Sequence, residues 1–237
     1  MKTRLFEIFT SIEGEGILYG TKTLFIRFAG CPFSCFYCDT PDALPSDSGK
    51  EYSISEACNL IDKNLQNNTY KVNFTGGEPL VQHESVSELA KYIKSKGILT
   101  YLESSCFDSK KFSYVLPSID LVKIEFKTKD SEMVDTKHYT DLIKNTLECL
   151  DASIKMKKIT YIKIVVSSKT ELDNLKTLSE QIFKIASRET ISGFIIQPTH
   201  GVSEPSLEKL LEFYDLVYPY YRDVRVIPQL QKIIDVP

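Results

Sequence analysis

The sequence lacks the features that mark fibrous, disordered, membrane-spanning or strongly basic proteins. It has only 10 glycines and 10 prolines in 237 residues, too few for a collagenous or low-complexity chain. Its longest apolar runs, such as 194–196 and 164–166, fall far short of the ~18 residues that a membrane span needs. Positive charge is not in excess either, because 29 Lys and Arg face 32 Asp and Glu. These absences argue against membranes and nucleic acids as partners and favour small molecules.

The N-terminus also lacks a secretion signal, since Glu7 falls where such a signal has its apolar segment. We therefore expect a cytoplasmic protein whose six cysteines are reduced. Cysteines that cluster in a reduced protein are more often metal ligands or catalytic groups than disulfide partners. Their positions thus become the main clue to function.

Short apolar, β-branched runs alternate with longer amphipathic segments along the chain. The expected strands are 24–28, 72–74, 99–102, 121–126, 161–166, 193–196 and 224–227. Strands joined by crossover helices pair in parallel, so about six such units predict an α/β fold, a partial barrel in a single domain. Ligands of such folds bind at the carboxyl ends of the strands.

The helices between these strands have recognisable ends. Ser53 and Ser85 each have a Glu three residues later, the spacing of a capping box, and Gly97 is expected to end the second helix. Further helices are expected at 135–153, 171–186 and 207–218, the last with Pro205 near its first turn.

Three cysteines occupy eight residues directly after the first of these strands. Six cysteines placed at random would show the C-x3-C-x2-C spacing of Cys31, Cys35 and Cys38 roughly 0.004 times. Three thiolates in one loop suit a cubane iron–sulfur cluster with one iron open to a ligand. The alternatives are structural zinc, which needs a fourth ligand, and plain packing. The other three cysteines are isolated and are expected to be small buried hydrophobes: Cys58, Cys106 and Cys149.

A second motif follows the strand at 72–74, where the chain reads Thr75-Gly76-Gly77-Glu78-Pro79. Two residues without a Cβ beside a carboxylate suit a ligand that approaches the backbone closely and carries an ammonium group. Taken alone, the pair of glycines fits a plain tight turn equally well.

Together the cysteine triad, the aromatic Tyr37 before its last cysteine and the Gly-Gly-Glu-Pro turn resemble the radical S-adenosylmethionine (SAM) superfamily. The resemblance implies a (β/α)6-type partial barrel and a [4Fe-4S] cluster on Cys31, Cys35 and Cys38. The open iron would chelate the amino and carboxylate groups of SAM, whose reductive cleavage gives a 5′-deoxyadenosyl radical.

A narrower resemblance covers nearly the whole chain. The segments 6–16, 25–31, 38–40, 197–198 and 228–232, with the last residue Pro237, are similar to the 7-carboxy-7-deazaguanine synthase family. These lyases convert 6-carboxy-5,6,7,8-tetrahydropterin to 7-carboxy-7-deazaguanine with loss of ammonia, for queuosine and archaeosine. The resemblance implies Mg²⁺ as a further cofactor, an electron donor such as a flavodoxin or ferredoxin, and a homodimer.

Carried over by position, the resemblance assigns roles to particular residues. The implied pterin contacts are Ile12, Glu13, Gly14, Glu15, Arg27, Thr75 and the terminal carboxylate of Pro237. The implied SAM contacts are Tyr37, Cys38, Asp39, Gly77, Glu78, Glu125, Phe126, Lys127 and Gln197. Thr40 would bind Mg²⁺. The N-terminal segment 1–20 and the C-terminal tail 228–237 would complete the substrate site of a single core domain, 1–237.

Two positions depart from the family pattern. The family usually has Gln where this chain has Glu13, and many members have His in place of Gln231. Two other functions also share parts of the pattern. One is a radical enzyme that activates a protein partner, and the other is an iron–sulfur electron carrier or zinc-stabilised module without catalytic activity.

Overall fold

A nine-stranded sheet frames the computed structural model, which describes residues 1–131 and 136–236, without the side chains of 136 and 137. In pairing order the strands are β3 (Lys50–Ser53), β1 (Lys2–Ile12), β2 (Lys22–Phe28), β4 (Lys71–Gly76), β5 (Leu99–Ser104), β6 (Leu121–Phe126), β7 (Ile159–Val166), β8 (Gly193–Pro198) and β9 (Val224–Val226). Neighbours from β2 to β9 are parallel, whereas β1 pairs antiparallel with both β2 and β3.

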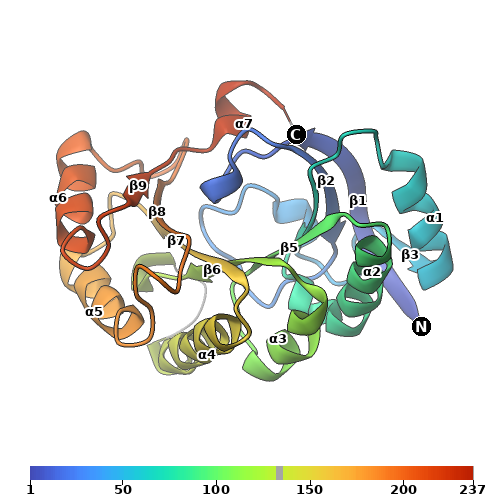
Figure 1. Cartoon of the computed structure of the whole chain (residues 1–237). Coiled ribbons are helices and arrows are strands. Elements are labelled where there is room, and N and C mark those ends of the chain that lie inside the picture. Colours follow the sequence, from blue (N-terminus) through green and yellow to red (C-terminus); the bar gives the residue numbers. More distant parts are fainter. Residues whose placement is uncertain (132–135, 237) are drawn as a thin grey trace.

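Helices connect the parallel strands and cover the outer side of the curved sheet (Figure 1). They are α1 (Ile54–Asn64), α2 (His83–Ser95), α3 (Ser109–Val115), α4 (Thr136–Lys155), α5 (Leu172–Ile182) and α6 (Leu207–Val217), while α7 (Leu230–Ile233) belongs to the C-terminal tail. Within the described residues, β3 and β9 are the two edges of the sheet and do not pair with each other. The predicted partial α/β barrel is confirmed.

The predicted strands are all present, but two strands and two α-helices were not predicted. These are β1, β3, α3 and α7, and the two strands extend the sheet beyond β2 through antiparallel pairs. The segment 1–20 was expected only to complete the substrate site, with no strand assigned to it. In the structure most of it is the eleven-residue strand β1, which pairs with β2.

The helix ends agree with the predictions in part. Ser53 and Glu56 form the predicted capping box, and Gly97 follows α2 with φ of +73°. The box predicted at Ser85 is wrong, because the 3₁₀ turn Pro79–Gln82 runs directly into α2, and Ser85 lies inside the helix. Pro205 precedes α6, whose N-cap is Ser206, and residue 135 lies outside the described residues.

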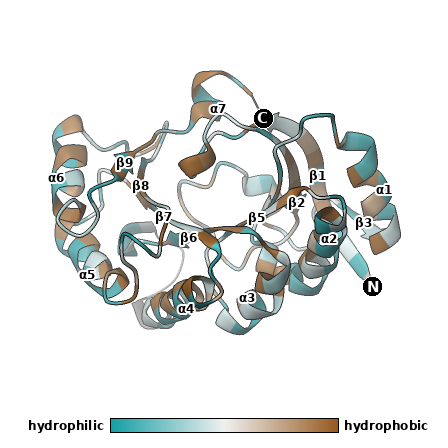
Figure 2. Ribbon diagram, in the orientation of Figure 1, coloured by the Kyte–Doolittle hydropathy of each residue, from teal (hydrophilic) through white to brown (hydrophobic). Residues whose placement is uncertain are grey.

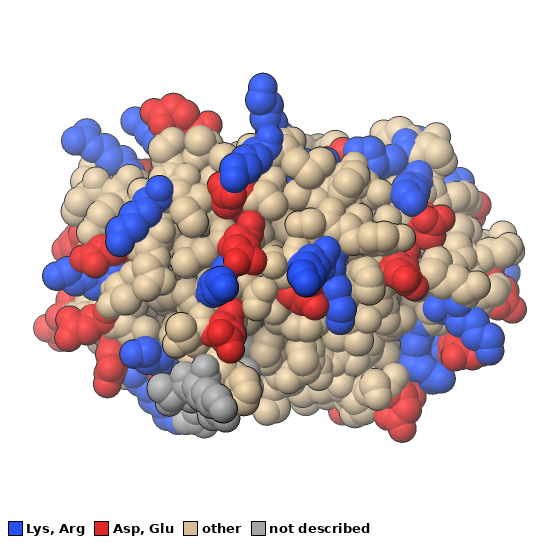
Figure 3. Space-filling view, turned by 90° about the horizontal axis from the view of Figure 1, so that it is seen from below, with Lys and Arg blue, Asp and Glu red and all other residues tan. Residues whose placement is uncertain are grey.

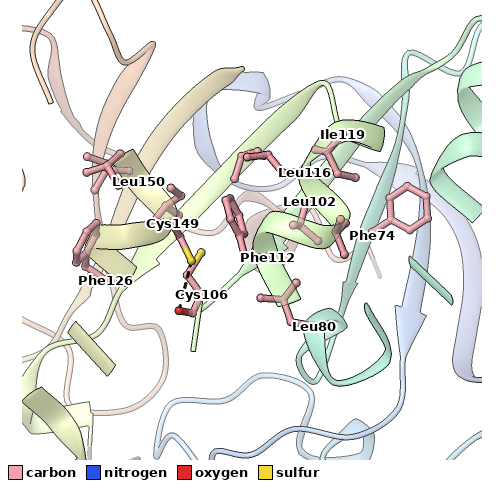
Figure 4. Packing of buried hydrophobic residues seen from close by; sticks show 14 of the residues in the cluster. Phe74, Leu80, Leu102, Cys106, Phe112, Leu116, Ile119, Phe126, Cys149 and Leu150 are labelled. Carbon is pink, nitrogen blue, oxygen red and sulfur yellow. Dashed lines mark hydrogen bonds between the residues drawn. The ribbon is translucent and has the colours of Figure 1, made fainter. Parts of the chain in front are cut away.

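The main core lies between the sheet and its helices. Brown apolar and teal hydrophilic residues alternate around these helices in Figure 2, as an amphipathic helix requires. Figure 4 shows Phe74, Leu102 and Phe126 from strands packed with residues from the helices. Cys106 and Cys149 are buried in this cluster, and Cys58 packs against it half-buried, as a small hydrophobe does.

The inner side of the sheet is different, because strand residues alternate between the two faces. In β6, Val122 and Ile124 pack outward in the core, whereas Lys123 and Glu125 lie on the inner side. A small apolar cluster lies on this inner side, formed by Tyr101, Leu121, Tyr161 and Ile195. Polar residues of the same strands line the interior above it.

The described surface carries charges of both signs. On the face seen from below in Figure 3, blue Lys and Arg side chains lie intermixed with red Asp and Glu, so the residues described there form no large area of one sign. In the part of the chain that the structure describes, no helix has the length and apolar character to cross a membrane.

Candidate active site

A cavity of about 390 Å³ occupies the interior of the barrel at the carboxyl ends of the strands. It is lined by side chains from nearly every motif that the sequence singled out. These predicted residues line it: Ile12, Glu13, Gly14, Glu15, Arg27, Cys31, Cys35, Tyr37, Cys38, Asp39, Thr40, Thr75, Gly77, Glu78, Glu125, Lys127 and Gln197. Pro237 lies outside the described residues, although its neighbour Val236 lines the cavity.

The cysteine loop forms one side of this cavity. Its start is fixed by the Cys31 amide, which donates to the carbonyl of Leu44 over 3.0 Å, and a turn closes between the Cys38 amide and the Cys35 carbonyl. Gly77, in the turn after β4, must be a glycine because its backbone packs closely against the cysteine loop. A Cβ on Gly77 would lie 2.5 Å from the Gly30 carbonyl oxygen and 2.9 Å from the Cys31 Cβ. The turn after β4 therefore packs backbone to backbone against the cysteine loop.

The three thiols fit a cluster better than a single ion. No three His, Cys, Asp or Glu side chains among the described residues converge as the ligands of one metal ion do. A cubane differs, because each thiolate binds a separate iron. Burial raises the pKa of Cys31 to about 12 and also raises that of Cys38, so metal binding must displace protons from them. The soft donor set and its partial exposure to the cavity suit a [4Fe-4S] cluster.

Glu78 does not present a free carboxylate to a ligand. It is 2% exposed and accepts hydrogen bonds from the Ser105 amide, the hydroxyls of Ser104 and Ser105, and the Leu80 amide, at 2.6–3.0 Å. These bonds tie the Gly-Gly turn to the carboxyl end of β5. The structure thus shows Glu78 holding the turn in place beside the cavity.

Glu15 joins the two ends of the chain. Its carboxylate accepts from Lys163 Nζ at 2.6 Å, and from the side-chain amides of Gln197, Gln229 and Gln231 at 2.9–3.2 Å. Burial would raise the pKa of Glu15, but Lys163 and Lys123 outweigh it and lower that pKa to about 2. Glu15 is therefore an ionised acceptor at neutral pH.

The C-terminal tail is held against the N-terminal segment. In Figure 1 the tail around α7 lies near the ends of β1 and β2. The Leu230 amide donates to the Gly14 carbonyl at 3.0 Å, and a Cβ on Gly14 would lie 1.8 Å from Gln231 Oε1. Glycine at this position leaves room for the Gln231 side chain to lie against the loop.

Arg27 and Thr75 lie in the cavity with partners already in place. Arg27 Nε donates to Glu7 Oε1 at 2.7 Å, and the guanidinium lies over the Phe9 ring. The Thr75 hydroxyl donates to Glu103 at 3.1 Å. A stacked guanidinium with one donor edge engaged retains further N–H groups for an anion.

The side chains of the predicted segment 125–127, at the end of β6, point alternately to the two faces of the sheet. Glu125 and Lys127 pair in the cavity, and Lys127 Nζ also lies 3.4 Å from the Tyr37 hydroxyl. Phe126 between them is fully buried in the outer core, so its side chain points away from the cavity and only its backbone can contact a cofactor. Burial opposes ionisation of Glu125, yet Lys127, Lys163 and Lys123 hold its pKa well below the usual range.

Sequence reasoning missed several charged residues of the cavity, namely Glu7, Glu103, Lys123 and Lys163. A signal was present: the expected strand 121–126 alternates apolar residues with Lys and Glu, which a strand buried on both faces by apolar packing does not do. That alternation identifies a polar inner face. Lys163 fits the same rule on β7, where it bridges Glu15 and Glu125.

Oxygen donors gather where Mg²⁺ is expected. The Thr40 hydroxyl donates to Asp39 Oδ1 at 3.2 Å, and the other Asp39 oxygen accepts from Gln229 at 3.2 Å. Hydroxyl and carboxylate oxygens are the ligands that Mg²⁺ prefers, and both side chains face the cavity.

Comparisons with known proteins decide the family. A family model described as a 4Fe-4S single cluster domain matches residues 12–141. The 7-carboxy-7-deazaguanine synthase of Methanocaldococcus jannaschii is 30% identical over 96% of this chain and 98% of its own length. The chain belongs to the 7-carboxy-7-deazaguanine synthase family. The 7-carboxy-7-deazaguanine synthase of Archaeoglobus fulgidus is likewise 30% identical, over the full length of both chains.

Solved structures support the fold of this 7-carboxy-7-deazaguanine synthase family member. The crystal structure of QueE from Escherichia coli superposes with a TM-score of 0.64 at 17% identity, over 97% of this chain and 95% of that chain. A radical SAM methyltransferase from Sphaerobacter thermophilus gives a TM-score of 0.65 at 11% identity, over 88% and 66%. The predicted radical SAM fold, the iron–sulfur cluster and SAM as cofactors are confirmed.

Proposed function

We propose that this cavity converts 6-carboxy-5,6,7,8-tetrahydropterin to 7-carboxy-7-deazaguanine, with release of ammonia, for the biosynthesis of 7-deazapurines such as queuosine and archaeosine. The observation that carries the proposal is the joining of both chain ends over a cysteine-lined cavity, through Glu15 and the C-terminal tail. Sequence relatives named for this activity support it over the full length of the chain.

The cofactor side of the cavity holds the groups that position SAM. The thiolates of Cys31, Cys35 and Cys38 would hold three irons of the cluster. When bound, the cluster and SAM supply the radical that removes a hydrogen atom from the pterin. The Gly77 backbone, held by Glu78, would face the amino group of SAM. Polar and aromatic groups around it complete the contacts: Tyr37, Cys38, Asp39, Glu125, Lys127, Gln197 and the backbone of Phe126.

The substrate side is built from the two chain ends and the inner strands. Ile12 and Gly14 would form one wall, and Glu15, ionised at neutral pH, would accept from the ring N–H groups of the pterin in place of one of the glutamine amides that it binds in the free protein. The remaining guanidinium edge of Arg27 would bind the substrate carboxylate, and Thr75 would contact the ring. Segment 1–20 and tail 228–237 thus complete the site, and the Pro237 carboxylate stays a predicted contact. Thr40, beside Asp39, would hold Mg²⁺ against the substrate.

The proposed reaction also implies an electron donor, a cellular location and an oligomeric state. Reduction of the cluster requires a low-potential electron donor, such as a flavodoxin or ferredoxin. We further propose that the enzyme works in the cytoplasm as a homodimer and contacts no nucleic acid directly.

The test is turnover by the anaerobically reconstituted and reduced protein. With SAM, Mg²⁺ and 6-carboxytetrahydropterin we expect 7-carboxy-7-deazaguanine and ammonia, measured by mass spectrometry and an enzymatic ammonia assay. Omission of Mg²⁺ should lower the rate. Cleavage of SAM without the deazaguanine product would overturn the proposed substrate while leaving the radical chemistry intact.

A further inference from the structure

A fully buried ion pair below the cavity has no place in the proposed chemistry. Lys71 on β4 is 0% exposed at its side chain, and Glu13 is 3% exposed. The Lys71 ammonium donates to Glu13 Oε2 at 2.5 Å and to the Thr23 hydroxyl at 2.7 Å, and it lies 4.8 Å from the centre of the Tyr101 ring. The buried ammonium is thus compensated by two hydrogen-bond acceptors, one of them a carboxylate, and by the face of an aromatic ring.

Lys71 is not among the residues that line the cavity, whereas Glu13 is. The Glu13 carboxylate turns inward to Lys71, with the Asn73 amide 3.4 Å from the same oxygen. The family usually has a neutral Gln here, a donor and acceptor that could face a ligand. In this chain the carboxylate is engaged below the cavity, so Glu13 acts on the site through its backbone.

The backbone of Glu13 begins the segment that forms the substrate wall. The Glu13 amide donates to Thr21 and its carbonyl accepts from Gly20, both at 2.8 Å, which closes the loop 13–20. Gly14 and Glu15 follow directly, and each contacts the C-terminal tail. A group that fixes Glu13 therefore fixes the first residue of this loop.

The charge environment explains why Lys71 is needed. Burial and the nearby Glu103 raise the pKa of Glu13 to about 7, while Lys71 acts to lower it. The other groups facing the pair are Glu15 on the same loop and the hydroxyls of Tyr101 and Tyr161. Removal of one buried charge leaves the other without compensation, which is far more costly than removal of both.

We propose that Lys71 is a positioning residue for pterin binding, which holds the Glu13 carboxylate below the cavity and so fixes the Gly14–Glu15 wall. The inference rests on the proposed function. Under this inference the charges of Glu13 and Lys71 compensate each other, so that an acid at position 13 requires a base at position 71.

The test compares Lys71→Met, Glu13→Gln and the double variant. We expect Lys71→Met to raise KM for the pterin about tenfold or more, with kcat changed less than about threefold and SAM affinity unchanged. The double variant should return KM to within about threefold of the original protein, since both charges are gone. An unchanged KM in Lys71→Met, or an equal loss in the single and double variants, would overturn the inference.

Two further variants serve as controls in case Lys71→Met changes the kinetics only by destabilising the fold. Lys94→Met breaks a surface pair with Asp120 and should leave KM unchanged. Thr23→Val removes only one acceptor of the Lys71 ammonium, and we expect a KM about threefold higher with kcat unchanged. If Lys71→Met does not fold, an unchanged KM in Thr23→Val overturns the inference.

Hydrogen exchange separates this inference from the proposed function. In the protein without substrate, the Glu13 amide should exchange at least about tenfold faster in Lys71→Met than in the original protein, and at the original rate in Lys94→Met. Equal exchange in Lys71→Met would overturn the positioning role even if the pterin proved not to be the substrate. Failure of the original protein to turn over the pterin would instead overturn the proposed function alone.

Discussion

The amide of Leu230 donates to the carbonyl of Gly14, so the last helix of the chain is hydrogen-bonded to the loop that follows the first strand. The two residues bring both chain ends to one side of the cavity. Gln229 and Gln231, on either side of Leu230, donate to Glu15, the residue directly after Gly14. Residues from both the first and the last segments of the chain are therefore needed to form this side of the cavity.

Gly14→Ala should open this contact. The added methyl group would lie 1.8 Å from Gln231 Oε1 and 3.0 Å from the Gln231 backbone nitrogen, so the Gln231 side chain must leave its place beside Glu15. We expect KM for the pterin to rise about tenfold, with SAM binding little changed, measured by steady-state kinetics and equilibrium binding. The double variant with Gln231→Ala should recover part of the loss, because the main clash is then gone. Equal kinetics in Gly14→Ala and the original protein would contradict a fixed contact between tail and loop.

Cys31→Ala, Cys35→Ala and Cys38→Ala should each lose the cluster. The original protein should contain about four irons per chain after anaerobic reconstitution, and each variant well under one, by iron analysis and visible absorbance. Cys58→Ala is the matched control, because that half-buried thiol packs against the core and should leave the iron content unchanged. One tightly bound zinc in the original protein would contradict the assignment.

Glu78→Ala should destabilise the protein although Glu78 lies at the site. Its loss leaves the Ser105 amide and two hydroxyls without their buried acceptor. We expect the free energy of unfolding to fall by about 2–4 kcal/mol in urea titrations. Ser105→Ala removes one of these bonds and should cost about 1 kcal/mol. A Glu78→Ala protein of unchanged stability but weaker SAM binding would instead show a carboxylate that acts on the ligand directly.

Stability should depend on pH through Glu13. Its pKa rises from an ordinary value near 4.5 to about 7 on folding, so the folded state binds a proton more tightly than the unfolded one. This contribution is complete below pH 4.5 and is lost as the pH rises toward 7. We expect Glu13→Gln to reduce the fall in unfolding free energy between pH 5 and pH 8 by about 1–3 kcal/mol. The exposed Glu212→Gln should leave the fall unchanged.

Glu15 should show the opposite dependence in the same titrations. Its pKa is lowered to about 2 on folding, so its contribution is present above pH 4.5 and is lost only as the pH falls toward 2. The Glu13 prediction has its own contradicting outcome. If unfolding free energy falls between pH 5 and pH 8 by the same amount in Glu13→Gln as in the original protein, groups other than Glu13 cause the fall.

Local patterns predicted the parallel strands, because β-branched runs between amphipathic segments have few alternatives. Cysteine spacing predicted the loop that bounds the cavity. The pairs Glu13–Lys71 and Glu15–Gln231 could not be predicted, since each joins residues far apart in the sequence and depends on barrel closure. The box at Ser85 failed because the spacing of two side chains does not reveal a 3₁₀ turn that starts the helix earlier.

The alternation along β6 makes pairing register a condition for catalysis as well as for stability. Val122, Ile124 and Phe126 anchor the strand to the helices, while Lys123 and Glu125 face the cavity. A slip of one residue against β5 or β7 would exchange the two sets, burying charges under the helices and filling the cavity with apolar side chains. A chain that paired this strand in the wrong register would lose its core packing and its binding site together. Such a misfolded form would therefore be unstable as well as inactive.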